Sequence, residues 1–392
     1  MKILYITATP LEYNSSANMR NIALIKGLEE LGNEVSTLSS DFCEDSIYIE
    51  SIESKVKLKD RYWIKLGQLQ SNITNKVNSK NKFKKKVKEK LYKIYTKFSI
   101  YDPRKTLTSK IKKGLVNSKF DLIISSSDPK SSHLLAEKII QLNPDITKMW
   151  IQYWGDPFCG DINRNTIIPD FFIKREEKRL IKKCDKVVYV SPFTLERQQK
   201  IYKEYKEKMV FVPIPFLKEK VYKNVKNEKV VLGYFGDYNS KDRNINHLYN
   251  VVKENIKLEL NICGNSDITL KEKENIKIKT RQKTSILTSL EEVVDILICI
   301  CNRSGTQIPG KIYHYAATNK PILIILDGQN RKELKRYFEG FDRFELCNNN
   351  EKDIEKAILN IINSKKNYKP SDLLEPKHIA QNIVEMFNNR EE

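Results

Sequence analysis

The residues of the C-terminal half best suited to chemistry lie in loops that follow runs of aliphatic residues. One such loop, CNRSGTQIPGK (301–311), combines glycines, hydroxyl groups and cations, and Pro309 suits the first turn of a helix that would begin there. Backbone N–H groups and a cation at a helix start can hold an anion such as a diphosphate. The residues predicted to do so are Ser304, Gly305, Thr306, Gly310 and Lys311.

Two further loops of this half have a similar composition. The stretch GYFGDYNSKDRN (233–244) offers Lys241 and Arg243 close to a helix start, and CGNSD (263–267) could contact a base or a ribose through its backbone. Any βα turn favours glycine and serine, but three such loops in one domain favour a diphosphate site, because open α/β sheets bind ligands at the carboxyl ends of their strands. Walker A and G-x-G-x-x-G motifs are absent, so the chain lacks the fingerprints of P-loop ATPases and dinucleotide enzymes.

In the N-terminal half, the motif YWGDPF (153–158) places Asp156 at the end of an expected strand. Two interpretations stay open, because Asp156 either faces a ligand or is an ordinary turn aspartate before a proline. Arg20 and the hydroxyl groups of Ser15 and Ser16 are expected to face the same place as Asp156.

The stretch SSSDPKSSH (125–133) belongs to the same edge of the sheet, although His133 could equally be an ordinary residue of a helix start. Glu176 and Glu177 lie among arginines and lysines on an expected helix, and we interpret both as surface ion-pair partners. No Ser/His/Asp or Cys/His arrangement typical of hydrolases can be recognised in the sequence, and no D-x-D metal motif occurs.

Alternating strands and helices position these loops. The expected strands are residues 2–8, 34–39, 121–127, 149–154, 186–191 and 209–215 in the first half, and 258–264, 295–301 and 321–327 in the second, where 229–238 are expected to form a strand and the loop after it. Buried strands that alternate with helices predict an α/β protein with parallel, doubly wound sheets.

A chain of 392 residues is expected to form two domains. We predict a Rossmann-like domain over 1–215 that contains a basic insertion at 55–119. A linker at 216–228 then leads to a second Rossmann-like domain over 229–375, and 376–392 form a last amphipathic helix.

The net charge of +20 is concentrated in the insertion, where 55–119 hold 21 Lys or Arg against three acids, a local charge of +18. An expected helix over 82–98 has one apolar stripe, with lysines on its other faces. This helix could pack on its own domain, contact an anionic membrane surface or bind nucleic acid. Few aromatic residues are available to stack on bases, so we prefer the membrane over nucleic acid. The predicted membrane contacts are Phe83, Lys84, Lys85, Lys86, Val87 and Leu91.

Composition argues against several other classes. No apolar run approaches the ~20 residues of a membrane helix, and Met1-Lys2 leads into an expected strand rather than a signal peptide. The seven cysteines are scattered without metal-ligand spacing, so neither a disulfide nor a structural zinc is expected. These features predict a reduced, cytoplasmic protein that lies peripherally at the inner face of the cell membrane.

Several of these stretches match one known pattern. They are the opening MKILYITATP with NMRNIALIKGLEELGNEVSTLS, then WGDPF, EEKRLIKKCDKVVYVSPF, LGYFGDY and IPGKIYHYAATNKPIL. Together they resemble the GT-B glycosyltransferases of the group 1 type (family four), and WGDPF is similar to a segment of a bacterial branch. The last stretch resembles the family segment K-x-Y-E-Y-x-A-x-G-K-P-I-L and is the most specific. The resemblance spans nearly the whole chain.

The resemblance implies two Rossmann-like domains that face each other across a cleft, with the C-terminal helix crossing back to the first domain. It also implies transfer of a sugar from a nucleotide sugar to a glycan or lipid-linked acceptor, with retention of configuration and without a metal or other cofactor. The implied roles are catalytic for Asp156 and Arg20, diphosphate binding for Lys241, Arg243, Ser304, Gly305, Thr306, Gly310 and Lys311, and nucleoside binding for Gly264, Asn265 and His314.

The chain also departs from the family pattern. Ser15 and Ser16 replace a Gly-Gly loop, Asp237 replaces an arginine, and the positions of two paired glutamates hold Thr306 and His314. These differences leave open a catalytically inactive scaffold or a nucleotide-sugar epimerase. The preferred prediction is a retaining transferase of bacterial surface polysaccharide or glycoconjugate synthesis.

Overall fold

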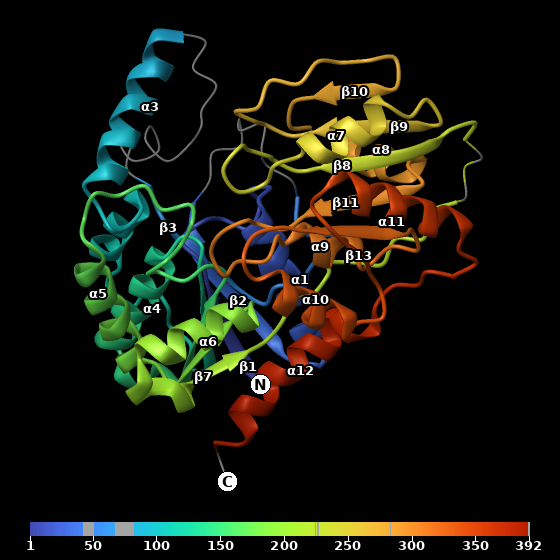
Figure 1. Ribbon diagram of the computed structural model, residues 1–392. Helices are drawn as coiled ribbons and strands as arrows, with labels where there is room; N and C mark the ends of the chain where they lie inside the picture. Colours follow the sequence, from blue (N-terminus) through green and yellow to red (C-terminus); the bar gives the residue numbers. More distant parts are fainter. Residues whose placement is uncertain (42–50, 67–81, 224, 226, 283, 391–392) are drawn as a thin grey trace. The chain divides into compact units, whose positions relative to one another are not determined.

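The computed structural model describes residues 1–41, 51–66, 82–223, 225, 227–282 and 284–390, apart from the side chains of 82–89 and 284–285. The chain forms two compact units, the first made of 1–214 with 376–392 and the second of 215–375. Each unit contains a parallel sheet with helices packed on it (Figure 1). The predicted α/β class with two doubly wound sheets is therefore confirmed.

The first unit is built on a seven-stranded sheet of order β3-β2-β1-β4-β5-β6-β7. Its strands are β1 (Lys2–Ile6), β2 (Glu34–Ser40), β3 (Arg61–Ile64), β4 (Phe120–Ser126), β5 (Thr147–Trp154), β6 (Lys186–Tyr189) and β7 (Met209–Phe211). Every pair of neighbours is parallel. The strands are runs of aliphatic and aromatic residues because both faces of the sheet are covered by helices.

Helices complete the first unit. They are α1 (Ser16–Glu30), α3 (Lys82–Lys97), α4 (Ser131–Leu142), α5 (Asp170–Lys183), α6 (Pro192–Ile201) and α12 (Pro376–Asn388). The C-terminal α12 packs on α1, which confirms the expected return of the last helix to the first domain. A Cβ on Gly27 would lie 2.0 Å from the carbonyl oxygen of Pro376, so this close approach requires glycine in α1.

Part of the basic insertion is integral to the first unit. Its strand β3 pairs with β2 at the edge of the sheet. Tyr101, Leu107 and Ile111 are buried in the same core cluster as Trp154. The segment therefore stabilises the unit as well as carrying charge.

The second unit is built on a six-stranded parallel sheet of order β10-β9-β8-β11-β12-β13. Its strands are β8 (Val230–Phe235), β9 (Leu258–Cys263), β10 (Ile276–Lys279), β11 (Ile296–Ile300), β12 (Ile322–Leu326) and β13 (Glu345–Asn348). Its helices are α7 (Asn246–Lys253), α8 (Thr284–Val293), α9 (Lys311–Tyr315), α10 (Arg331–Glu339) and α11 (Glu351–Asn363). Among the described residues of the chain, no helix is long and apolar enough to cross a bilayer.

Candidate functional site

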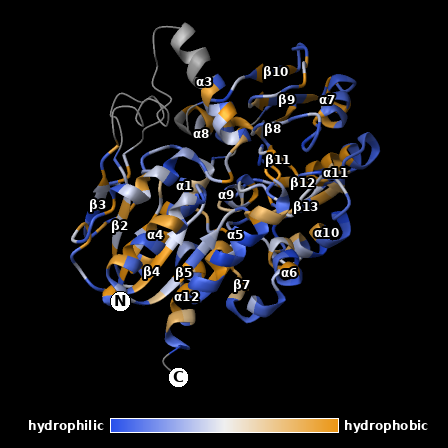
Figure 2. Cartoon of the chain, turned by 90° about the vertical axis from the view of Figure 1, so that its left-hand side faces the viewer, coloured by the Kyte–Doolittle hydropathy of each residue, from blue (hydrophilic) through white to orange (hydrophobic). Residues whose placement is uncertain are grey.

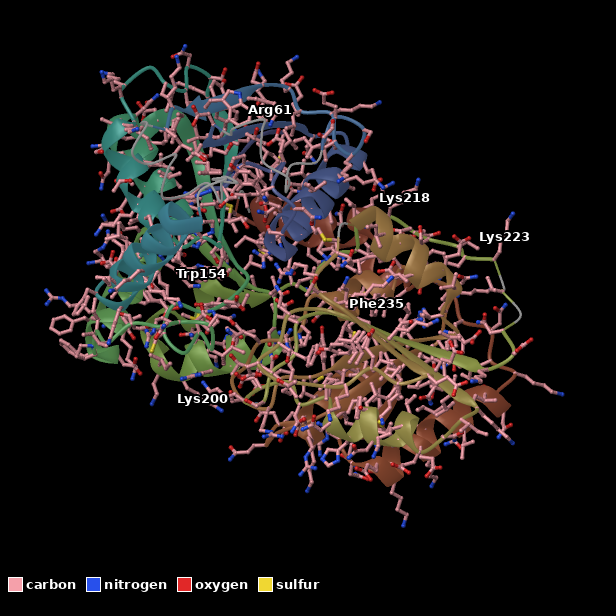
Figure 3. The ribbon with its side chains drawn as sticks, turned by 90° about the horizontal axis from the view of Figure 1, so that it is seen from above. Arg61, Trp154, Lys200, Lys218, Lys223 and Phe235 are labelled. Atoms are coloured by element: carbon pink, nitrogen blue, oxygen red, sulfur yellow. The ribbon has the colours of Figure 1, made fainter. Side chains whose placement is uncertain are left out.

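Each sheet has a switch point beside its first strand. In the first unit β1 lies between β2 and β4, and in the second β8 lies between β9 and β11. At a switch point, the connections from two neighbouring strands run to opposite sides. The loops at the carboxyl ends of these strands therefore separate and can admit a ligand. Trp154 ends β5 and Phe235 ends β8, so these two side chains mark the carboxyl edges of the two sheets (Figure 3).

Three carboxyl groups and a lysine meet at the carboxyl edge of the first sheet. Lys130, just before α4, lies with its Nζ 2.5 Å from Asp128 Oδ1 and 2.9 Å from Asp161 Oδ2. Asp156, in the loop after β5, shares a hydrogen bond with Asp128. The sequence predicted at this edge both Asp156 and the stretch 125–133, which contains Asp128 and Lys130, but it gave no sign that Asp161 would join them.

Asp156 and Asp128 compete for ionisation because their carboxyl groups are hydrogen-bonded to each other. Burial raises the pKa of Asp156 to about 7, and the charges of Asp128 and Asp161 act in the same direction. Burial also disfavours ionisation of Asp128, but the Lys130 ammonium outweighs this and holds the pKa of Asp128 below its usual value. Asp156 is therefore the member of the pair that takes up a proton near neutral pH.

Arg20 reaches this pair alongside the glycine of the YWGDPF motif. Its guanidinium donates a hydrogen bond to the Ser127 carbonyl and lies 5.3 Å from the centroid of the Tyr153 ring. A Cβ on Gly155 would come within 1.9 Å of Arg20 Nη1, so a larger residue there would displace the guanidinium from its present position. Arg20 and Asp156 thus belong to one cluster, and their catalytic role stays a prediction.

Glu177 is not the surface residue that its basic neighbours indicated. It is buried on α5, where its carboxylate accepts hydrogen bonds from the N–H groups of Phe158 (2.9 Å) and Cys159 (3.0 Å) and from the hydroxyl of Tyr202 (2.8 Å). Burial raises the pKa of Glu177, although these three donors favour its ionised form. Glu177 thereby holds the loop that carries Asp156.

Two other residues of this region have structural roles. Glu176 forms the expected ion pair with Arg179, at 2.8 Å. His133 is buried, with Nδ1 2.8 Å from Ser125 Oγ and its ring centroid 4.2 Å from that of Trp154. Burial lowers the pKa of His133 to about 3, so it is a neutral core residue.

In the second unit, the loops after β8 and β11 are tied together. Arg243 Nε donates to Asn302 Oδ1 at 2.7 Å, and Ser304 Oγ donates to Asp242 Oδ1 at 2.5 Å. These bonds tie together the loops that carry Arg243 and Ser304, and they occupy the Ser304 hydroxyl and the Nε–H of Arg243. Arg243 Nη1 also donates to the Asp237 carbonyl at 3.4 Å. Diphosphate binding by these two residues stays a prediction. Lys241 is exposed at the tip of the first of these loops.

The loops after β8 and β9 are also in contact. A Cβ on Gly264 would lie 2.0 Å from the Gly236 carbonyl oxygen, so glycine is required there. The N–H of Asn265 donates to Asp237 Oδ1 at 2.9 Å, and Arg281 forms an ion pair with Asp237 Oδ2. Since the backbone N–H of Asn265 is engaged, its predicted contact with a nucleoside would come from the exposed side chain.

Lys311 is the first residue of α9, so this short helix begins two residues after Pro309, where the sequence had placed its start. Gly310 caps it, Thr306 is half-buried, and Gly305 has a φ of 78° that favours glycine. The predicted residues of this loop therefore precede α9 directly.

The Lys311 ammonium is poorly hydrated. Burial lowers the pKa of Lys311, and its Nζ lies 5.5 Å from the centroid of the Tyr315 ring. The carboxylate that acts on it most strongly, Glu291, is already bound to Lys220 at 2.8 Å and to the hydroxyl of Tyr222 at 2.7 Å. Within the described part of the chain, Lys311 forms no ion pair with a carboxylate.

His314 lies on the same helix and is uncharged. Burial lowers the pKa of His314 to about 3, and the charges of Lys311 and Lys220 add to the effect. Its Nε2 has no hydrogen-bond partner among the described residues. A neutral imidazole of this kind can bond a ligand hydroxyl, but it cannot replace the anionic glutamate that the resemblance implied.

The predicted membrane contacts fall on α3. Five of them lie outside the described side chains: Phe83, Lys84, Lys85, Lys86 and Val87. The rest of the stripe is solvent-exposed, with Leu91 57%, Ile94 48% and Phe98 64% accessible. Figure 2 shows hydrophobic and hydrophilic residues mixed along the described part of α3. The helix contacts its own unit through other groups. The Tyr95 hydroxyl donates to the Asp102 carbonyl at 3.4 Å, and the Lys97 carbonyl accepts from the Ile167 N–H at 2.9 Å. In the part described, the stripe therefore does not pack on the first unit.

Comparison with known proteins identifies the fold. No model of a protein family matches the sequence, and a search of curated proteins found no match. Among solved structures, the chain is similar to Anabaena HepE in complex with UDP and glucose, at 11% identity over 100% of this chain and 95% of that one, with a TM-score of 0.54. Sucrose-phosphate synthase from Thermosynechococcus elongatus is 12% identical over 99% and 94% of the two chains, with a TM-score of 0.55. A glycosyltransferase from Rickettsia africae is 17% identical over 99% and 93%, with a TM-score of 0.51.

The chain has the GT-B fold. In this GT-B protein, the residues predicted from sequence gather at the carboxyl edge of the sheet in each unit. Arg20 and Asp156 meet in the first unit, and Arg243, Ser304, Gly264, Asn265, Lys311 and His314 lie in or directly after the loops that follow β8, β9 and β11 in the second.

Proposed function

We propose that this GT-B protein is a glycosyltransferase that moves a sugar from a nucleotide sugar to a hydroxyl group of an acceptor. The observation that carries the proposal is Lys311, a poorly hydrated cation without a carboxylate partner among the described residues. Such a cation is costly unless an anion binds to it, and a donor diphosphate would supply that anion. The complex of Anabaena HepE with UDP and glucose supports this class of donor.

In the proposed reaction, the bond between the anomeric carbon and the diphosphate oxygen breaks, and the nucleoside diphosphate leaves with the bonding electrons. The acceptor oxygen forms the new bond to the anomeric carbon on the face that the diphosphate leaves, and it gives its proton to the departing phosphate. Attack on this face retains the configuration. Lys311 and Arg243 would stabilise the negative charge that develops on the leaving group, so a metal ion is not needed for this step. Ionised Asp156 would accept a hydrogen bond from the acceptor hydroxyl and stabilise positive charge on the sugar.

A second candidate is a scaffold that has lost transfer activity or that epimerises a nucleotide sugar. It is favoured by Asp237, which forms an ion pair with Arg281 where the resemblance implied an arginine, and by the neutral His314. Both differences remove a group that the resemblance assigns to donor binding.

Calorimetric titration of the whole chain separates these candidates. With UDP, GDP, ADP, TDP and their common sugar derivatives, we expect one nucleotide to bind with a micromolar Kd, in the presence or absence of EDTA. Failure of every nucleotide to bind would leave the inactive scaffold. Conversion of a nucleotide sugar to its epimer without any acceptor would favour the epimerase, and loss of binding in EDTA would contradict metal independence.

We further propose that the acceptor is part of a lipid-linked glycan and that the first unit docks on the anionic inner face of the cell membrane. The docking patch consists of the exposed residues Leu91, Ile94, Phe98, Ile167, Phe171 and Phe172. The Ile167 N–H donates to the Lys97 carbonyl at 2.9 Å, so the end of α3 adjoins the segment before α5. Exposed lysines at 90, 93 and 97 flank the apolar residues. Apolar side chains surrounded by lysines suit an interface with anionic lipids.

Flotation with vesicles of phosphatidylcholine and phosphatidylserine tests the docking patch. Leu91→Asp and Phe98→Asp should each reduce the partition constant between vesicles and solution about tenfold or more. Each removes an apolar side chain that contributes roughly 1.5–3 kcal/mol when buried. Leu359→Asp is the matched control, since Leu359 is 49% exposed on α11 of the second unit. Equal vesicle binding by all three variants and the unaltered chain would contradict membrane docking.

A further inference from the structure

A cavity of about 500 Å³ opens in the first unit beside the Asp156 cluster. It is bounded by the loops after β1 and β4, by the segment around residue 102 and by the loop that contains Asp161. Its volume lies in the range of small-molecule sites, which is roughly 300–1,000 Å³. Three carboxylates and three cations line it: Asp102, Asp128, Asp161, Arg104, Lys130 and Arg164.

The carboxylates of this cavity are already bonded within the protein. Asp102 accepts from the N–H of Arg104 at 3.0 Å and from the N–H and hydroxyl of Ser131 at 3.2 and 2.8 Å. Asp128 and Asp161 both bind the Lys130 ammonium. The lining therefore has little capacity left to bind a cation.

Unlike the carboxylates, the two arginines of the lining have N–H groups without a partner among the described residues. Arg104 is only 9% exposed, its Nε has no hydrogen-bond partner, and its guanidinium forms no ion pair in the part of the chain that the structure describes. Arg164 binds Asp170 through Nη2 at 2.5 Å, but its buried Nη1 has no partner among the described residues. Both guanidinium groups thus line the same cavity, and each has a buried N–H without a partner among the described residues.

These donors indicate an anionic ligand. Burial lowers the pKa of Arg104, but an arginine side chain stays protonated in proteins. A buried guanidinium without a partner is destabilising, and its planar donors match the oxygens of a phosphate group. The lining also contains the apolar side chains of Tyr92, Ile100 and Phe158, which suit the face of a sugar ring.

We propose that this cavity binds a phosphorylated sugar, with Arg104 and Arg164 holding the phosphate and the carboxyl cluster facing the sugar hydroxyls. Its use as the acceptor of a transfer rests on the proposed function, whereas the binding itself does not. The phosphate belongs either to a soluble sugar phosphate or to a lipid carrier. The second source is compatible with Tyr92, which lines the cavity from α3, the helix that also carries part of the docking patch.

Binding is measured with the whole chain by calorimetry, using hexose 1-phosphates and 6-phosphates, the corresponding neutral hexoses, and prenyl-diphosphate-linked sugars in detergent micelles. We expect a phosphorylated probe to bind with a Kd between the submicromolar and the millimolar range. Neutral hexoses should bind at least tenfold more weakly. The probe that binds more tightly identifies the source of the phosphate. Equal binding of neutral and phosphorylated hexoses, or no binding of any phosphorylated probe, would overturn the proposal.

Arg104→Met and Arg164→Gln are each expected to lower the affinity for the phosphorylated probe at least tenfold and to leave the affinity for nucleoside diphosphates unchanged. Arg104→Lys keeps a cation and should retain part of the affinity, and Arg164→Gln keeps the proposal testable if Arg104→Met fails to fold. Unchanged probe affinity in Arg164→Gln and in a folded Arg104 variant would remove the arginines from the site. If no nucleoside diphosphate binds but phosphorylated sugars do, the proposed function fails while the anionic site stands.

Discussion

Asp156→Asn is expected to stabilise the protein at pH 8 while lowering kcat/KM at least ~100-fold, the scale of a group that handles a proton or a charge in the transition state. The pKa of Asp156 is about 7 in the folded chain, above the ~3.9 of an unfolded aspartate. Its contribution to the free energy of unfolding is therefore complete below pH ~4 and is lost as the pH rises to about 7. Asparagine cannot ionise, so the variant should gain on the order of 1–3 kcal/mol above pH 7.

Thermal unfolding and initial rates between pH 5 and 9 measure both effects. In the unaltered chain kcat/KM should rise with pH through about 7, because ionised Asp156 is the active form. Asp128→Asn removes a nearby negative charge and should move this inflection to lower pH. Asp145→Asn, at an exposed aspartate, is the control and should change neither quantity. A loss of stability with unchanged activity would favour the alternative that Asp156 is an ordinary turn aspartate before proline.

The fold was predictable because both units repeat one simple pattern. Buried parallel strands are nearly continuous aliphatic runs, and runs such as LIISS and ILIIL contrast with the polar helices between them. Three strands were missed: β3, β10 and β13. Each has four residues and forms an edge of its sheet, so each includes charged residues, such as Arg61, Lys277 and Glu345, and its pattern is too short to recognise.

The site was predictable only to the level of loops. Parallel strands have all their carboxyl ends at one edge of the sheet. This rule was enough to group Arg20 with Asp156 and Arg243 with Ser304. Which group bonds to which depends on tertiary contacts that leave no local pattern. Glu177 illustrates this, because its partners are backbone N–H groups of another segment, and a glutamate among lysines and arginines looks exposed in the sequence.

Lys311→Met is expected to weaken transition-state stabilisation by about 2–4 kcal/mol, the scale measured for one preorganised donor, and so to reduce kcat/KM by roughly 30- to 1,000-fold. Nucleoside diphosphate affinity should fall as well. The free energy of unfolding should stay the same or rise in the absence of ligand. Burial lowers the pKa of Lys311, so the charged ammonium is disfavoured in the folded chain at neutral pH, and methionine of similar length removes that penalty.

Calorimetric binding and chemical unfolding of the same variant decide whether Lys311 acts on the ligand or on the fold. Lys335→Met is the matched control, because Lys335 lies exposed on α10 and pairs only loosely with Glu339, at 3.7 Å. Unchanged binding of the diphosphate, or an effect on kcat/KM below tenfold, would remove Lys311 from the site. A large loss of stability would instead show that the ammonium has a structural partner. Because a bound diphosphate favours the charged ammonium, binding to the unaltered chain should also take up protons at pH values above the lowered pKa of Lys311, and this uptake should disappear in Lys311→Met.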